Sequence, residues 1–213
     1  MTSAPPYHSR RTLLAGLATL PLCGNALAAG KAPVITLLGD SITAGYGLRA
    51  ADALPAQLQL ALARIGVVAA VRGAGLSGDT TAGGLGRLDF SVRADTTLCL
   101  VELGGNDLLQ GLDPRTTRAN LTAIVQRLKA RRMKVLVCGL TAPPRLDHRF
   151  AAEFNAVFPE VAHAEGVALY PNLLGGVELA PGLNQGDGIH PNVKGVKVIV
   201  ARLAPAVARV LRS

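Results

Sequence analysis

The segment VITLLGDSITAGYG at residues 34–47 joins an apolar run to a glycine-rich turn that carries a serine. The run at 34–38 predicts a buried strand, and Ser41 then falls at a strand-to-helix turn. Further runs with strand character follow at 67–72, 97–103, 134–140 and 167–170. The spacing of these runs leaves room for a helix between successive strands.

Helical patterns fill those intervals. They run from Pro55 to Ile65, briefly from near Asp79, from the N-cap Asp113 to about Arg131, from His148 to Glu165, and from the N-cap Asn192 to Leu211 with a kink expected at Pro205. Alternating helices and near-continuously apolar strands predict an α/β fold, in which a parallel sheet is covered on both faces.

The composition fits one well-buried domain and argues against nucleic-acid binding. The 213 residues are 49% apolar and only 3% aromatic, and the net charge is +8. A basic balance can indicate nucleic acid, anionic lipid or simple solubility. The Lys and Arg residues are scattered and have no aromatic side chains among them for base stacking. A solvated basic surface is therefore the favoured interpretation.

The first 28 residues have the pattern of an export signal. SRRTLL at 9–14 is a twin-arginine motif, the apolar run at 13–22 is too short to span a membrane, and ALA at 26–28 fits a cleavage site. We expect a signal peptide over 1–28, a single domain over 29–213, and an exported, periplasmic or secreted protein without stable membrane insertion. A lipid anchor at Cys23 is disfavoured because the bulky Leu22 precedes it.

Two cysteines remain in the expected mature chain. Cys99 and Cys138 each fall inside a predicted buried strand. An exported protein can hold a disulfide, but bridging needs Cα atoms within about 7 Å. The two positions are offset along their strands, which favours two buried free thiols and leaves the pairing open.

A second motif, DGIHPN at residues 187–192, supplies an acid and a base three residues apart. A serine hydroxyl needs a base within hydrogen-bond reach, and that base needs an acid to orient it. Ser41, Asp187 and His190 thus form a candidate catalytic set in that chain order. We expect Asp40 to be structural, because its side chain should point away from that of its neighbour.

Candidate oxyanion donors follow two other strands. Asn106 lies in VELGGND at 101–107, and Gly78 lies in LSGD at 76–79. The carboxyl ends of parallel strands meet at one edge of a sheet, where ligands bind. The Asn106 amide and the backbone N–H groups of Gly78 and Ser41 can therefore stabilise an oxyanion at that edge.

These blocks, together with SGDTTAGGL at 77–85, resemble the SGNH (GDSL) hydrolase family over nearly the whole mature chain, and most closely its bacterial thioesterase I, lysophospholipase L1 and arylesterase group. The resemblance implies a flavodoxin-like three-layer α/β/α sandwich with a five-stranded parallel sheet. It implies Ser41 as nucleophile, His190 as base, Asp187 as its support, and Ser41, Gly78 and Asn106 as the oxyanion hole. Aryl esters, short to medium acyl esters, thioesters or lysophospholipids would be the substrates, with no cofactor.

The chain departs from relatives in two places. Gly73 stands where relatives often have Asn, and the loop at 107–111 is more apolar than in some relatives. We expect a pocket for acyl or aryl groups, and assign to it Leu108, Leu109, Pro143 and Ile189. No spacing of His, Cys or Asp suggests a metal site.

Two alternatives remain open. GAGLSG at 73–78 matches the dinucleotide-binding pattern through Gly73, Gly75 and Gly78, but it follows the second strand and lacks the acidic residue expected about 20 residues later. An O-acetyl esterase acting on polysaccharide or peptidoglycan is the nearer competitor, because members of the same family deacetylate carbohydrates.

Overall fold

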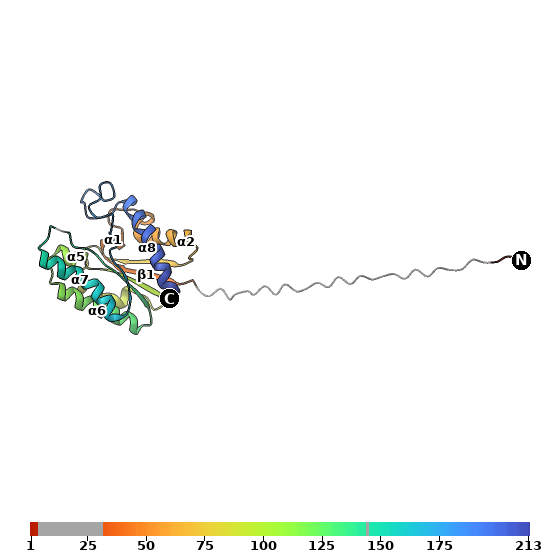
Figure 1. Ribbon diagram of the computed structural model, residues 1–213, viewed down its shortest axis with the longest axis horizontal. Helices are drawn as coiled ribbons and strands as arrows, with labels where there is room; N and C mark the ends of the chain where they lie inside the picture. Colours follow the sequence, from red (N-terminus) through yellow and green to blue (C-terminus); the bar gives the residue numbers. More distant parts are fainter. Residues whose placement is uncertain (4–31, 144) are drawn as a thin grey trace. The chain divides into compact units, whose positions relative to one another are not determined.

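Five parallel strands form one sheet in the order β2-β1-β3-β4-β5 (Figure 1). The computed structural model describes residues 1–3, 32–143 and 145–213. The strands are β1 (Val34–Gly39), β2 (Ala70–Gly75), β3 (Leu98–Glu102), β4 (Lys134–Cys138) and β5 (Ala168–Tyr170). All four strand pairs are parallel, which confirms the predicted sheet.

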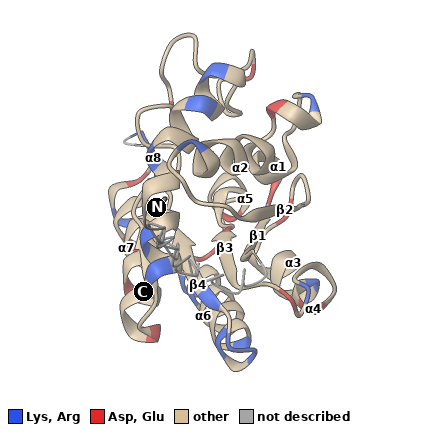
Figure 2. Ribbon diagram, turned by 90° about the vertical axis from the view of Figure 1, so that its right-hand side faces the viewer, with Lys and Arg blue, Asp and Glu red and all other residues tan. Residues whose placement is uncertain are grey.

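Helices cover both faces of this sheet, as Figures 1 and 2 show. One layer consists of α2 (Leu54–Arg64) and α8 (Val193–Arg212), and the other of α6 (Pro114–Ala130), α7 (His148–Glu165) and the short α3 (Thr81–Gly86). The remaining short helices are α1 (Ser41–Ala44), η1 (Ala50–Asp52), α4 (Leu88–Ser91) and α5 (Gly105–Leu109). The chain is therefore an α/β/α sandwich, as expected.

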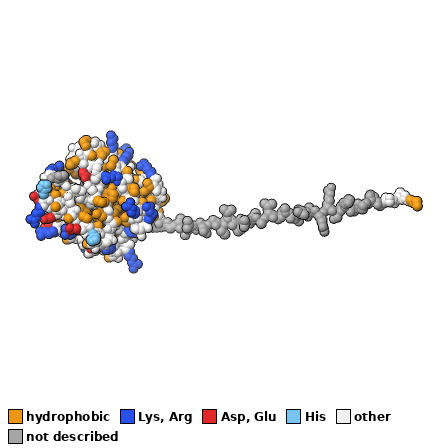
Figure 3. Space-filling model, viewed as in Figure 1, with side chains coloured by type: hydrophobic (Ala, Val, Ile, Leu, Met, Phe, Trp, Pro, Cys, Tyr) orange, Lys and Arg blue, Asp and Glu red, His pale blue; other side chains and the backbone are white. Residues whose placement is uncertain are grey.

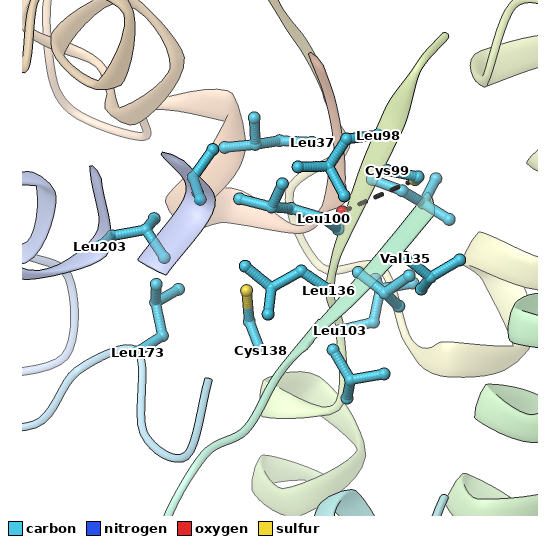
Figure 4. Close-up of a cluster of buried hydrophobic side chains, with 14 of the residues drawn as sticks. Leu37, Leu98, Cys99, Leu100, Leu103, Val135, Leu136, Cys138, Leu173 and Leu203 are labelled. Atoms are coloured by element: carbon cyan, nitrogen blue, oxygen red, sulfur yellow. Dashed lines mark hydrogen bonds between the residues drawn. The ribbon is translucent and has the colours of Figure 1, made fainter. Parts of the chain in front are cut away.

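The core lies on the two faces of the central strands. Every residue of β1 and β3 is buried, and so is β4 apart from its first residue. Figure 4 shows leucines of these strands meeting Leu173 and Leu203 of the α8 side. Burying one such side chain contributes about 1.5–3 kcal/mol, so the central strands are the rigid base on which the loops stand.

The second strand differs from its predicted position by three residues. It was expected at 67–72 but spans Ala70–Gly75, because Val67 is still held by the end of α2, donating its N–H to Leu62 O. A Cβ at Gly75 would collide with the backbone of Asp40 and Ala44, so a glycine is needed where β2 passes under α1.

This position of β2 also counts against the dinucleotide-binding alternative. That motif needs its first two glycines in the turn between strand and helix. Here Gly73 and Gly75 are paired inside β2, opposite Leu37 and Gly39 of β1. The glycines serve close packing of the chain instead of an approach to a pyrophosphate.

Helix α8 is continuous through Pro205. The described part of the chain contains no helix that is both long and apolar enough to span a membrane. Residues Lys31–Ser213 form one compact unit. The predicted twin-arginine motif, the cleavage site and Cys23 lie outside the described residues.

The two described cysteines are free and buried. Cys99 pairs with Val135 in the sheet, three residues before Cys138. Successive side chains of a strand alternate between faces, so the two sulfurs lie on opposite faces, as Figure 4 shows. A disulfide between them would require breaking the sheet.

We therefore predict that neither thiol reacts in the folded protein. Burial raises the pKa of Cys99 to about 12 and that of Cys138 well above its ordinary value. Thiolates are the reactive form. Ellman's reagent should label no thiol of the chain starting at residue 29 under native conditions, and both in guanidinium. Two unreactive thiols in guanidinium without reductant would instead reveal a disulfide.

Candidate active site

The site lies where the strand order reverses. The chain passes from β1 to β2 on one side of the sheet and crosses back to β3 on the other side. Such a switch point opens a crevice beyond the carboxyl ends of the strands. Ser41 follows β1, and Asn106 lies on α5, four residues after β3 ends. Both therefore stand at the mouth of this crevice.

Three side chains form a continuous hydrogen-bonded row in the crevice. His190 Nε2 lies 2.9 Å from Ser41 Oγ, and His190 Nδ1 lies 2.6 Å from Asp187 Oδ2. The serine and the histidine are 149 residues apart in the chain. The fold thus brings together the three residues that the two motifs predicted, at distances suited to proton transfer.

Asp187 is held by its own turn. Its Oδ1 accepts hydrogen bonds from the backbone N–H groups of Ile189 (2.9 Å) and His190 (3.0 Å), and Gly188 between them has φ +69°. The hydrogen bond with the His190 ring, followed by that from Ile189 N–H, lowers the pKa of Asp187 to about 2. The carboxylate therefore stays ionised and orients the ring by accepting from Nδ1.

Asp40 shapes the turn that presents the serine. Its Oδ1 accepts from Ile42 N–H at 3.0 Å and so caps α1, whose other end closes on Gly45 in the left-handed conformation. Its Oδ2 accepts from Asn106 Nδ2 at 3.2 Å. Burial raises the pKa of Asp40 to about 6. The side chain thus has a structural position, as expected from its place beside Ser41.

Glu102 lies buried beneath this turn and was not singled out from the sequence. Its Oε2 accepts from Thr43 Oγ1 at 2.7 Å and from Asp40 N–H at 3.4 Å. Its Oε1 has no hydrogen-bond partner among the described residues. Burial and the neighbouring Asp40 raise the pKa of Glu102 well above its usual range, which favours the protonated acid. This group ties α1 to the end of β3.

The candidate oxyanion donors converge beside Ser41. Gly78 has φ +82°, which only glycine adopts readily, and it lines the same groove as Ser41 and Asn106. Asn106 Nδ2 donates to Asp79 O at 2.8 Å as well as to Asp40 Oδ2. Both amide hydrogens therefore have protein acceptors, and the longer bond is the one to Asp40.

Two further side chains brace these loops. Arg87 donates to Asp79 Oδ2 at 2.6 Å and to Gly39 O at 2.7 Å, which links the Gly78 turn to the end of β1. Asp107 is 1% exposed and accepts from Thr81 Oγ1 at 2.5 Å and from Thr81 N–H at 2.8 Å. Nothing in the local sequence distinguishes these residues from ordinary turn residues, because their partners are far away in the chain.

An apolar groove of about 480 Å³ runs from Ser41 across the edge of the sheet. All four residues assigned to a pocket from the sequence line it: Leu108, Leu109, Pro143 and Ile189. Leu140, Leu146 and Leu174 extend the apolar wall, whereas Arg145 and Glu178 are its charged members besides the site residues. The groove therefore offers a mainly apolar surface directly beside Ser41.

Tyr46 and Gln185 join the two halves of the site and were also missed. The Tyr46 ring lies 4.7 Å from the His190 ring, centroid to centroid. Gln185 Nε2 donates to Tyr46 O at 2.7 Å and to Pro191 O at 3.1 Å. A Cβ at Gly47 would collide with the Gln185 amide, so this glycine leaves room for it. One amide thus fastens the histidine loop to the serine turn.

Comparison with known proteins identifies the class of enzyme. Residues 37–198 match the GDSL-like lipase/acylhydrolase family. Esterase TesA of Pseudomonas aeruginosa is 39% identical over 85% of this chain and 90% of its own length. Thioesterase 1/protease 1/lysophospholipase L1 of Escherichia coli K12 is 37% identical over 77% of this chain and 78% of its own length. An arylesterase of Vibrio mimicus is 34% identical over 74% of this chain and 79% of its own length.

Solved structures agree with this assignment. The crystal structure of TesA superposes with a TM-score of 0.79 at 36% identity, covering 83% of this chain and 99% of that chain. AlinE4, an SGNH-hydrolase family esterase, gives a TM-score of 0.71 at 41% identity over 86% of this chain and 99% of that chain. The chain belongs to the GDSL-like lipase/acylhydrolase family. It is a carboxylic ester hydrolase.

The buried Asp40 predicts a pH-dependent stability. Because its pKa is raised from 3.8 to about 6, the folded state holds the proton more tightly than the unfolded state. This contribution is complete below the unfolded pKa and is lost as the pH rises through about 6. Asp40→Asn cannot ionise. The free energy of unfolding of the wild type should therefore fall relative to Asp40→Asn between pH about 4 and about 7 in denaturant titrations.

Asp89→Asn is the matched control, since the Asp89 side chain is 74% exposed. Its unfolding free energy should run parallel to that of the wild type over the same pH range. Parallel curves for Asp40→Asn as well would show that burial does not perturb this carboxyl.

Removing the amide that joins the two loops should slow catalysis more than it weakens substrate binding. Gln185→Ala keeps the backbone hydrogen bond from Gln185 N–H to His190 O but loses both side-chain donors. Small misplacements of catalytic groups cost up to about 10²-fold. We expect kcat to fall about ten- to hundredfold, with KM changed less than about twofold. Gln126→Ala on α6 is the control, and an equal loss there would refute the assignment.

Proposed function

We propose that this hydrolase acts by covalent catalysis, with Ser41 as nucleophile, His190 as base and Asp187 as the group that orients the base. The observation that carries this proposal is the row of two hydrogen bonds, 2.9 Å and 2.6 Å long, that joins the three side chains. In this arrangement the imidazole takes the hydroxyl proton as the oxygen attacks.

The reaction balances with these side chains and water. Ser41 Oγ bonds to the ester or thioester carbonyl carbon, and its proton moves to His190 Nε2. The tetrahedral intermediate collapses, and the same nitrogen protonates the leaving alcohol or thiol. Water then attacks the acyl-enzyme with His190 again as base, which releases the acid and restores the serine hydroxyl. The ionised Asp187 stabilises the imidazolium formed in each half of the reaction.

The oxyanion is proposed to sit on the N–H groups of Ser41 and Gly78 and on the Asn106 amide. Because both amide hydrogens of Asn106 have acceptors in the free protein, one of them must be shared or released when the oxyanion forms. The 3.2 Å bond to Asp40 is the longer of the two. Each donor of this kind typically contributes 10²- to 10³-fold in rate.

The groove supports an acyl or aryl ester as substrate. Six leucines, two isoleucines and one proline line it, and it begins at the serine. Short to medium acyl esters, aryl esters, thioesters and lysophospholipids all place an apolar group beside the carbonyl carbon. A carbohydrate O-acetyl ester would place hydroxyl groups there, and the apolar walls offer them few hydrogen-bonding partners. We therefore favour the acyl or aryl substrate.

Export is proposed from the sequence alone. The twin-arginine motif, the short apolar run and the small-residue cleavage site at 26–28 support a periplasmic or secreted enzyme. Comparing the N-terminus of the protein purified from cells with residue 29 would test the proposed cleavage.

A panel of p-nitrophenyl acetate, butyrate, octanoate and palmitate tests the proposed chemistry. Ser41→Ala should lose about 10⁴- to 10⁶-fold in kcat, because the nucleophile acts as a unit with its base. Turnover should persist beyond acetate, because the groove extends from the serine along apolar walls.

Ser77→Ala is the matched control, because Ser77 also lines the groove and lies outside the hydrogen-bonded row. It should retain turnover within about tenfold of wild type. Loss of activity in Ser77→Ala but not in Ser41→Ala would reject the proposed nucleophile. Turnover restricted to acetyl groups on polysaccharide would reject the acyl and aryl substrates.

A further inference from the structure

The two helical layers of the sandwich carry their charges differently. On the α6 and α7 layer, cations are paired with acids except for Arg127, which has no ion pair among the described residues. These pairs are Arg115–Asp113 at 2.7 Å, Arg118–Glu160 at 2.5 Å, Lys129–Glu165 at 3.2 Å and Arg149–Glu153 at 2.9 Å. This layer therefore presents a mixed surface with little net charge.

The charged side chains of the helices in the opposite layer are all basic. Helices α2 and α8 contain no Asp or Glu at all. Their six basic side chains, which we call the cationic face, are Arg64, Lys194, Lys197, Arg202, Arg209 and Arg212. All six are exposed, and none forms an ion pair within the part of the chain that the structure describes.

The placement of these cations follows helix geometry. At 3.6 residues per turn, the five basic residues of α8 fall within an arc of about 140°. The buried stripe of the same helix, which includes Ile199, Leu203 and Val207, packs against the sheet. The cations therefore lie on the solvent side along the length of the helix, where Arg202 also donates to Gly175 O. Because α8 contains Lys and Arg but no Asp or Glu, its ribbon in Figure 2 carries blue segments and no red ones.

Apolar side chains accompany the cations at the end of α2. Leu60 precedes Arg64 by one helical turn, and Ile65 directly follows it; both apolar residues are 48% exposed. Val68, just beyond, is 78% exposed. In the space-filling view, orange patches adjoin blue ones on this side of the folded unit (Figure 3). Neither helix has an aromatic side chain on which a nucleic-acid base could stack.

We propose that the cationic face binds the anionic phospholipid surface of a bilayer, without insertion of a helix. Each Lys or Arg near such a surface contributes about 1 kcal/mol at most. Six of them, helped by the exposed Leu60 and Ile65, suffice for reversible attachment. Lys194 lies four residues after His190, so the face begins beside the catalytic loop. Attachment would therefore hold the groove near a lipid surface. The proposal does not depend on the catalytic mechanism.

Vesicle sedimentation can distinguish binding through the cationic face from binding that depends only on the net charge of the protein. The folded unit, residues 31–213, is mixed with vesicles of pure phosphatidylcholine or of phosphatidylcholine with about 30 mol% phosphatidylglycerol at low salt. The wild type should sediment with the anionic vesicles only, and about 0.3 M NaCl should release it because salt screens exposed charges. The triple variant K194Q/K197Q/R209Q should bind at least about tenfold more weakly.

The matched control is R115Q/R118Q/R149Q on the other layer, which also removes three positive charges. It should bind anionic vesicles within about threefold of wild type. Both triple variants should hydrolyse a soluble ester as the wild type does, which shows that they are folded.

Three results would overturn the proposal. These are equal losses in the two triple variants, sedimentation of the wild type with neither or with both kinds of vesicle, and tighter binding of a short DNA duplex than of anionic vesicles at the same salt. The first would assign binding to net charge, the second would remove the electrostatic attachment, and the third would assign the face to nucleic acid.

Discussion

The site depends on one close approach, that of helix α1 to the strands beneath it. This approach requires glycine at positions 39 and 75, because a Cβ at either position would collide with α1 or with Glu102. Within the space so formed, Glu102 accepts from Thr43 and from the Asp40 backbone, and Asp40 caps the helix. The buried Glu102 and the two glycines thus fix the position of Ser41 relative to the sheet.

The second half of the site reaches this turn from the other end of the chain. The loop before α8 is braced internally, since Asn192 donates to Gly182 O and Asn184 O. Gln185 then fastens the loop to the backbone of Tyr46. Because the loop is internally braced, the hydrogen bond from Gln185 to Tyr46 O positions it as a unit. This places His190 within hydrogen-bond distance of Ser41, which lies 149 residues away in the chain.

The charged groups of the site and those of the surface are arranged differently. At the site, burial raises the pKa of Asp40 to about 6 while hydrogen bonds lower that of Asp187 to about 2, so the two aspartates differ in protonation state between these pH values. At the surface, the cations of the α6 and α7 layer other than Arg127 are in ion pairs, whereas those of α2 and α8 have none among the described residues. Within the described part of the chain, unpaired positive charge is therefore concentrated on the α2 and α8 layer.

The sequence by itself determined the sandwich, its parallel sheet and the residues gathered at one edge, because strand periodicity and short local motifs carry that information. It placed β2 three residues too early, because the glycines of that strand are required by its close packing against α1 and are unfavourable for a strand by local propensity. Only the tertiary structure decided the partners of Asn106, the burial of Glu102 and the fastening by Gln185. Those interactions join residues distant in the chain, and no local pattern encodes them.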